Sequence, residues 1–133
     1  MIYSLDTNTC VESLRGKNPR VAAKFSTITP SDVVICSVVR AELWYGAEHS
    51  QHPAVQLAKV AAFLTPFATQ IFDDAAARAY GTLRASLRKA GTIIGPNDLL
   101  IATLALVNGS IMVTHNTAEF ARVPNLTLED WEI

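Results

Sequence analysis

The chain has 133 residues, half of them hydrophobic, so it can bury a core and is not expected to be disordered. Its net charge of −1 argues against a partner held over a broad basic surface. No apolar run reaches the roughly 20 residues of a membrane-spanning helix, and Asp6 interrupts any N-terminal signal. Two cysteines are too few for a disulfide framework and suit a reducing cytoplasm. We therefore expect one cytoplasmic domain over residues 1–133.

The N-terminal part alternates short apolar runs with helical patterns. Residues 2–5 predict a buried strand, and Thr7 or Asn8 is expected to cap a helix that breaks near Gly16. A second helix is expected to begin at Pro19, because proline suits the first helical position.

The middle of the chain begins with a β-branched run, residues 33–37, which predicts the second strand. Ser37 is expected to cap a helix that runs through Tyr45 and ends near Gly46. Another helix is expected over residues 53–64.

The C-terminal half continues the alternation. Asp73 and Gly91 bound a long helix, and Gly95 precedes a helix over residues 96–107. The strands expected in this half cover residues 69–72, 110–114 and, weakly, 126–128. Strands that alternate with helices and lack polar alternation predict a parallel sheet covered on both faces. The fold class is thus a three-layer α/β domain with a central parallel sheet of four or five strands.

Four polar side chains fall where open parallel sheets bind ligands, beyond the carboxyl ends of the strands. Asp6 follows the first strand, and Glu42 lies on the helix after the second. Asp98 lies near the start of the helix before the fourth strand, and Asn116 follows that strand. Each has an ordinary alternative: a helix dipole stabilises an acid like Asp98 by ~0.3–1 kcal/mol, Asp6 suits a turn or cap, and Glu42 suits a solvated face.

The helix that carries Asp98 is apolar from Leu99 to Val107 except at Thr103, so its carboxylate is expected to be partly desolvated. No basic residue lies near Asp6 or Asp98 in the sequence. If the acids converge, like charges within ~4 Å repel by about 4 kcal/mol at an effective dielectric of 20. A divalent cation relieves this repulsion, and an all-oxygen ligand set suits Mg²⁺ or Mn²⁺.

The ordered motifs LDTNT, SVVRAELWYGAE, IGPNDLLIA and VTHNTAEF, with the closing LEDW, resemble the PIN-domain family. More narrowly, the chain is similar from Ile2 to Trp131 to the VapC toxins of bacterial toxin–antitoxin pairs. Within these toxins the pattern is closest to enzymes that cut initiator tRNA in its anticodon stem-loop. The resemblance implies a PIN fold with an acidic pocket for Mg²⁺ or Mn²⁺. It also implies endoribonuclease activity that leaves a 3′-hydroxyl and a 5′-phosphate.

The same resemblance assigns roles to residues. By motif, Asp6, Glu42 and Asp98 are metal ligands and catalytic residues. Asn116 takes a fourth catalytic position that is an aspartate in many relatives, a departure that lowers the negative charge of the site. Thr114 is a candidate to orient the attacking water.

Four further residues have weaker assignments. Glu119 could supplement the acidic cluster, although an ordinary exposed helix residue is the favoured interpretation. Arg15, Lys17 and Arg20 follow soon after Asp6 and are candidates to contact the RNA backbone.

The resemblance also implies partners. A cognate antitoxin is expected to lay a helix or tail across the toxin and to insert an arginine among the carboxylates. Trp44 and Tyr45 are candidates for its contact surface, and core packing explains them equally well. We expect a homodimer or a toxin–antitoxin hetero-oligomer, and no membrane partner.

Other functions remain open at this point. DTNT resembles the nucleophile motif of haloacid-dehalogenase-like phosphatases, but Asn8 replaces the general acid. A receiver-type signalling domain would need a lysine after a late strand, and an inactive PIN-like binding module has only Asn116 in its favour. A Cys10–His115 nucleophile pair and a zinc site at His49 and His52 are weaker still.

Overall fold

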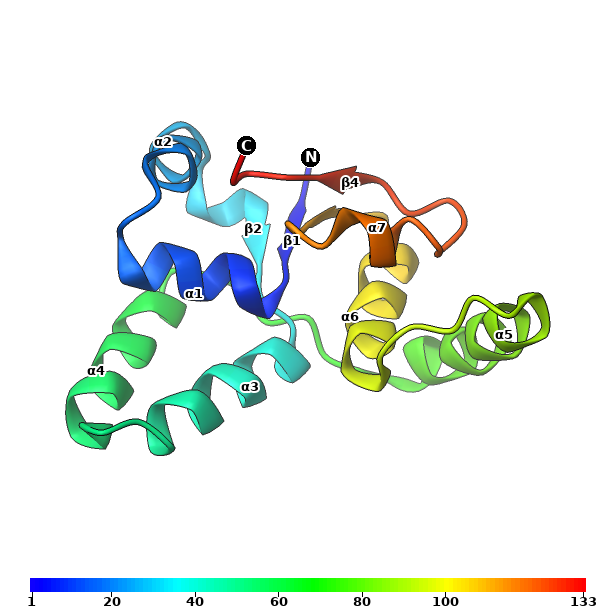
Figure 1. Cartoon of the computed structure of the whole chain (residues 1–133), viewed down its shortest axis with the longest axis horizontal. Helices are drawn as coiled ribbons and strands as arrows, with labels where there is room; N and C mark the ends of the chain where they lie inside the picture. The colour runs from blue at the N-terminus through cyan, green and yellow to red at the C-terminus, as the bar shows by residue number, and fades with distance from the viewer.

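The computed structural model describes residues 1–133, and four parallel strands in the order β2-β1-β3-β4 form its central sheet (Figure 1). The strands are β1 (Tyr3–Leu5), β2 (Val33–Val34), β3 (Ile111–Val113) and β4 (Leu128–Glu129). Tyr3 is paired with β2 on one side and with β3 on the other. The strand order therefore reverses at β1, and the carboxyl end of β1 lies at the topological switch point, where ligands bind in open α/β sheets.

Helices flank this sheet, as the alternating pattern predicts. They are α1 (Thr7–Arg15), α2 (Pro19–Thr27), α3 (Ser37–Glu48), α4 (Pro53–Leu64), α5 (Asp74–Ala90), α6 (Pro96–Val107) and α7 (Thr117–Phe120). In Figure 1, α1 to α4 lie on one side of β1, whereas α5 and α6 lie on the other. The helix α3 packs on α1 and α4, and α6 packs on α5 and β3. The α/β class with a flanked parallel sheet is confirmed, with four strands.

Local capping explains most helix ends. The Asp73 carboxylate accepts a hydrogen bond from the Ala76 N–H at 2.9 Å and begins α5. Gly91 ends α5 in the left-handed conformation, with φ of +72°, which glycine adopts without steric cost. Pro96 occupies the first turn of α6, as predicted. No helix of the chain is both long and apolar enough to cross a membrane.

Two caps differ from the prediction. Asp6, rather than Thr7 or Asn8, caps α1, because its carboxylate accepts the Thr9 N–H at 2.8 Å. Cys36 precedes α3, so Ser37 is already helical, and the helix continues through Gly46 to Glu48. Val39, Leu43 and Ala47 form a buried stripe on this helix. The helix continues beyond Gly46 because the packing of that stripe outweighs the helix propensity cost of glycine, which is about 1 kcal/mol.

The strand predicted over residues 69–72 is wrong. This segment forms no ladder: Ala68 makes a single bridge to Val34, and the Gln70 carbonyl accepts the Ser37 N–H at 3.0 Å. The strand β2 has only two residues and α3 begins at Ser37, so β2 is too short to form a ladder with residues 69–72. Ile71 is 66% exposed, which shows that the segment has already left the core.

Candidate active site

Asp6 joins β1 to α1 and is buried, with 4% of its surface exposed. Its Oδ1 accepts the Thr9 N–H at 2.8 Å, and its Oδ2 accepts the Thr114 hydroxyl at 2.6 Å. The Asp6 N–H donates to the Val113 carbonyl at 3.0 Å, which extends the pairing of β1 with β3. The carboxylate is thus fixed between two strands, and each oxygen retains acceptor capacity for a further ligand.

Glu42 reaches the same region from α3. Its Oε1 accepts the Thr7 hydroxyl at 2.9 Å, so the first turn of α1 holds both Asp6 and Glu42. The neighbouring Val39 and Leu43 are buried against the core and fix the face of α3 that carries the glutamate. Sequence spacing alone gave no sign of the hydroxyl of Thr7 between these two acids.

Asp98 and Glu119 meet at the start of α6. The Gly95 N–H donates to Glu119 Oε1 at 2.9 Å, and a Cβ added at Gly95 would lie 3.6 Å from that oxygen and from Asp98 Oδ2. The pKa of Asp98 is raised to about 6, first by burial, then by repulsion from and hydrogen bonding to Glu119, and then by repulsion from Asp6 and Glu42. The four carboxylates therefore share one electrostatic environment.

Asn116 and Thr114 hold these acids in place. The Asn116 side-chain amide donates to Glu119 Oε2, and the Asn116 backbone N–H donates to Thr114 Oγ1 at 3.0 Å. Because Thr114 in turn donates to Asp6, one hydrogen-bonded chain links Glu119 to Asp6. The exposed-helix interpretation of Glu119 is wrong: the side chain is half-buried beside Asp98. Its position three residues after Asn116, on the short helix α7 that follows β3, was the available signal.

No basic side chain neutralises this cluster. The ion pairs of the structure are Arg15–Glu12, Lys24–Glu129 and His115–Asp130, and none includes Asp6, Glu42, Asp98 or Glu119. Unpaired, mutually repelling carboxylates are the donor set that suits a hard divalent cation. The four acids are too widely spaced for three of them to bind one ion directly, because no three bring one oxygen each within 4.8 Å of one another. They fit a cation held partly through water.

Comparison with known proteins decides the family. Residues 3–126 match the PIN domain. The chain belongs to the PIN-domain family of VapC ribonuclease toxins. It is 39% identical over 129 residues to the tRNA(fMet)-specific endonuclease VapC of Salmonella typhimurium, covering 97% of each chain. It is 40% identical over 138 residues to Ribonuclease VapC2 of Rickettsia felis, covering 99% of each.

Solved structures agree with this family. The crystal structure of DNA-bound VapBC from Salmonella typhimurium matches this PIN domain with a TM-score of 0.93 and 37% identity, over 98% of each chain. VapBC2 from Rickettsia felis, bound to a promoter DNA fragment, matches with a TM-score of 0.91 and 36% identity, over 98% of this chain and 99% of that one. PIN-domain nucleases are typically metal-dependent, in agreement with the unpaired acids. The membership excludes the phosphatase and receiver alternatives.

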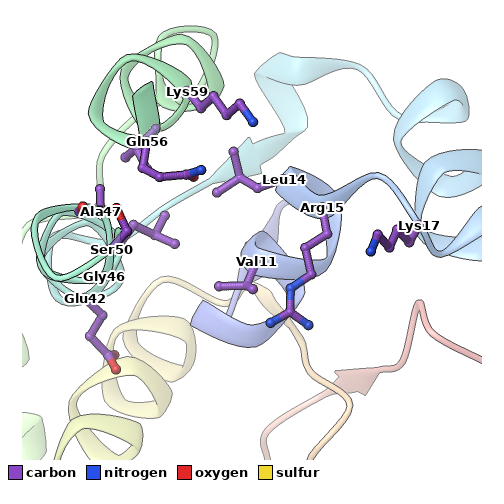
Figure 2. Close-up of a pocket in the computed structure, with 12 residues that line it drawn as sticks. Val11, Leu14, Arg15, Lys17, Glu42, Gly46, Ala47, Ser50, Gln56 and Lys59 are labelled. Carbon is purple, nitrogen blue, oxygen red and sulfur yellow. Dashed lines mark hydrogen bonds between the residues drawn. The ribbon is translucent and has the colours of Figure 1, made fainter. Parts of the chain in front are cut away.

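The basic candidates of this VapC-type PIN domain lie in different places. Arg15 lines a cavity of about 380 Å³ together with Asn116, and it also lines a groove that contains Glu42. Lys17 lines a groove of about 470 Å³ between α1, α3 and α4 that also contains Glu42 (Figure 2). Arg20 lines a third cavity, beside Trp131, that includes none of the four acids. Arg15 and Lys17 thus share a groove with Glu42, whereas Arg20 does not.

The weaker alternatives lose support in this PIN domain. Cys10 is fully buried, and burial raises the pKa of its thiol well above the usual value, so it is not a nucleophile. His49 stacks on Tyr45, and neither His49 nor His52 belongs to a group of three metal-binding side chains. Tyr45 is 67% exposed and Trp44 38% exposed, so core packing does not explain them.

Proposed function

We propose that this VapC-type ribonuclease requires Mg²⁺ or Mn²⁺, cuts initiator tRNA in its anticodon stem-loop, and is neutralised by a cognate VapB-like antitoxin. The gathering of four carboxylates without a basic partner carries the metal assignment. The substrate assignment is supported by relatives of 39–40% identity that are tRNA(fMet)-specific endonucleases.

Asp6, Glu42 and Asp98 are the proposed metal ligands. A bound divalent cation supplies positive charge beside the scissile phosphate and makes a nearby water more acidic. The chain's own contribution is orientation: Thr9 and Thr114 fix Asp6, and Thr7 fixes Glu42. Asp6 or Glu42 then orients or deprotonates the attacking water for in-line displacement, which leaves a 3′-hydroxyl and a 5′-phosphate.

RNA selection is proposed to rest on shape and on bases splayed from a loop, since single-stranded loops expose the edges that proteins read. Arg15 and Lys17 line the groove that contains Glu42 and are the proposed phosphate contacts. Arg20 lies outside this arrangement and is not expected to contribute as much. Two phosphate contacts predict a modest loss of affinity with added salt, which matches the net charge of −1.

The groove in Figure 2 is the proposed antitoxin surface. Its apolar wall includes Val11, Leu14, Leu43 and Val60, and Glu42 lies at one end of it. An amphipathic helix or tail would bury its apolar side chains there. A guanidinium at its end would pair with Glu42 and replace the charge of the metal. The VapBC complexes of the Salmonella and Rickettsia relatives support such a partner, and a homodimer stays a prediction.

The experiment incubates the purified chain with labelled initiator tRNA and an elongator tRNA, in Mg²⁺ or EDTA. We expect cleavage of the initiator tRNA in Mg²⁺, none in EDTA, and strongly reduced cleavage with Asp6→Asn. Asp74→Asn, an exposed acid on α5, serves as the matched control and should cleave normally. Cleavage that survives EDTA and Asp6→Asn would contradict the assigned mechanism. Absence of cleavage of any RNA, with no Mg²⁺ bound at millimolar concentration, would favour the inactive-module alternative.

A further inference from the structure

A second group of ligand-bearing side chains lies outside the catalytic acids. His115, Asp130 and Glu132 each place one potential ligand atom within 4.8 Å of the other two, and no other three side chains of the chain do so. His115 Nδ1 lies 2.9 Å from Asp130 Oδ2. The imidazole is exposed, whereas the Asp130 side chain is only 10% exposed. One nitrogen and two carboxylates therefore converge at the surface from two distant segments.

The two carboxylates are held in place by the residue between them. Trp131 is 1% exposed, and its ring packs on Tyr3 and Phe25 with centroid distances of 5.6 and 5.2 Å. The Glu132 N–H donates to Asp130 Oδ1 at 2.9 Å, which leaves Oδ2 for His115. The buried indole thus fixes the backbone on which both acids stand. Such preorganisation reduces the entropy lost when ligands close on an ion.

The electrostatic surroundings favour a cation. Asp130 and then Glu132 raise the pKa of His115, which shows a negative potential at the imidazole. Burial raises the pKa of Glu132, His115 partly opposes that rise, and Glu12, Asp130 and Asp6 add to it by repulsion. The nearby Arg15 guanidinium, which borders the same cavity as His115 and Glu132, is paired with Glu12 at 3.4 Å. The histidine is the main charge partner of Asp130 and Glu132.

We infer that His115, Asp130 and Glu132 form a second divalent-metal site, for an ion of the Zn²⁺ type, separate from the catalytic carboxylates. Imidazole nitrogen with carboxylate oxygens is a usual zinc ligand set, and water completes the coordination at an open surface site. His115 directly follows Thr114 and precedes Asn116, the two residues that hold Asp6 and Glu119. A bound ion would therefore tie the catalytic loop to the C-terminal tail and restrict its movement.

The histidine count makes the test direct, because the chain has only His49, His52 and His115. Imidazole ¹H–¹⁵N spectra of the full chain are recorded during a titration with Zn²⁺. We expect the His115 signals to shift and to saturate as Zn²⁺ is added, while those of His49 and His52 serve as internal controls. Glu132→Gln should weaken Zn²⁺ binding at least tenfold. Asp98→Asn, in the catalytic cluster, should change it less than twofold.

Three results would overturn the inference. The first is a His115 signal that does not respond to Zn²⁺. The second is unchanged affinity in Glu132→Gln and in His115→Gln, which would leave a plain His115–Asp130 ion pair. The third is loss of the His115 response in Asp98→Asn, which would place the ion on the catalytic acids instead. Because the titration needs neither RNA nor Mg²⁺, its outcome is independent of the cleavage assay for the proposed function.

Discussion

Replacing Asp98 by asparagine should stabilise the fold while it abolishes RNA cleavage. Asparagine has the same shape and removes a charge that burial disfavours and that Glu119, Asp6 and Glu42 repel. Its amide can also donate a hydrogen bond to the Glu119 carboxylate. A gain in stability with a loss of function is the signature of a site that holds mutually repelling groups for a ligand.

The magnitude follows from the pKa of Asp98, which rises from an ordinary 3.8 to about 6. At 1.36 kcal/mol for each pKa unit, an ionised Asp98 destabilises the metal-free fold by at most ~3 kcal/mol. Solvent reaches part of the side chain and screens the repulsion, so we expect about 1–2 kcal/mol. For a chain of 133 residues this corresponds to a rise of about 4–8 °C in Tm.

The pH dependence has a definite sign. Because the folded-state pKa of Asp98 lies above its ordinary value, its protonated form stabilises the fold below pH 3.8. That stabilisation is lost as the pH rises through about 6. The Tm of Asp98→Asn should therefore exceed that of the wild type most strongly above this pH. The difference should shrink toward zero near pH 4.

The assay is thermal unfolding in EDTA at pH 7.5 and pH 4, followed by circular dichroism, and then repeated in Mg²⁺. Mg²⁺ should raise the Tm of the wild type, because a ligand that binds only the folded state stabilises that state. It should have little effect on the Tm of the variant, which lacks one of the proposed metal ligands. Asp74→Asn is the matched control. Asp74 is an exposed acid in the first turn of α5, where its negative charge interacts favourably with the helix dipole, so removing that charge should lower the free energy of unfolding by ~0.3–1 kcal/mol. A lower or unchanged Tm for Asp98→Asn at pH 7.5 in EDTA would show that neither burial nor the neighbouring acids disfavour the charge of Asp98.

Three other substitutions test further parts of the structure. Asp6→Asn should reduce kcat for RNA cleavage by about 10²–10³, measured by gel electrophoresis, because the proposed metal loses its most buried ligand. Thr114→Val removes the 2.6 Å hydrogen bond to Asp6 and should lower the free energy of unfolding by ~1–3 kcal/mol in urea titrations, with kcat affected more than KM. Trp131→Ala should lower the free energy of unfolding by ~3–5 kcal/mol and also weaken Zn²⁺ binding at His115. Unchanged Zn²⁺ affinity would show that the buried indole does not position Asp130 and Glu132.

Much of the fold could be predicted because its signals are local. Pro19 and Pro96 mark helix starts, Asp73 caps α5, and Gly91 ends it, each through the conformation of one or two residues. The strand predicted over residues 69–72 failed because strand formation depends on a partner that lies elsewhere in the chain. A two-residue β2 left this segment with one bridge, a fact that no local pattern contains.

The motifs and the alternation of strands and helices were enough to predict the family, the parallel α/β class and the joint action of Asp6, Glu42 and Asp98. The three-dimensional fold was needed to show that Glu119 lies beside Asp98, that Thr7 and Thr114 orient the acids, and that His115 meets the C-terminal tail. The physical reason is the distance along the chain over which each kind of interaction acts. Helix caps and apolar periodicity depend on neighbours a few residues away, whereas these contacts depend on the strand order that brings the carboxyl ends of β1 and β3 together.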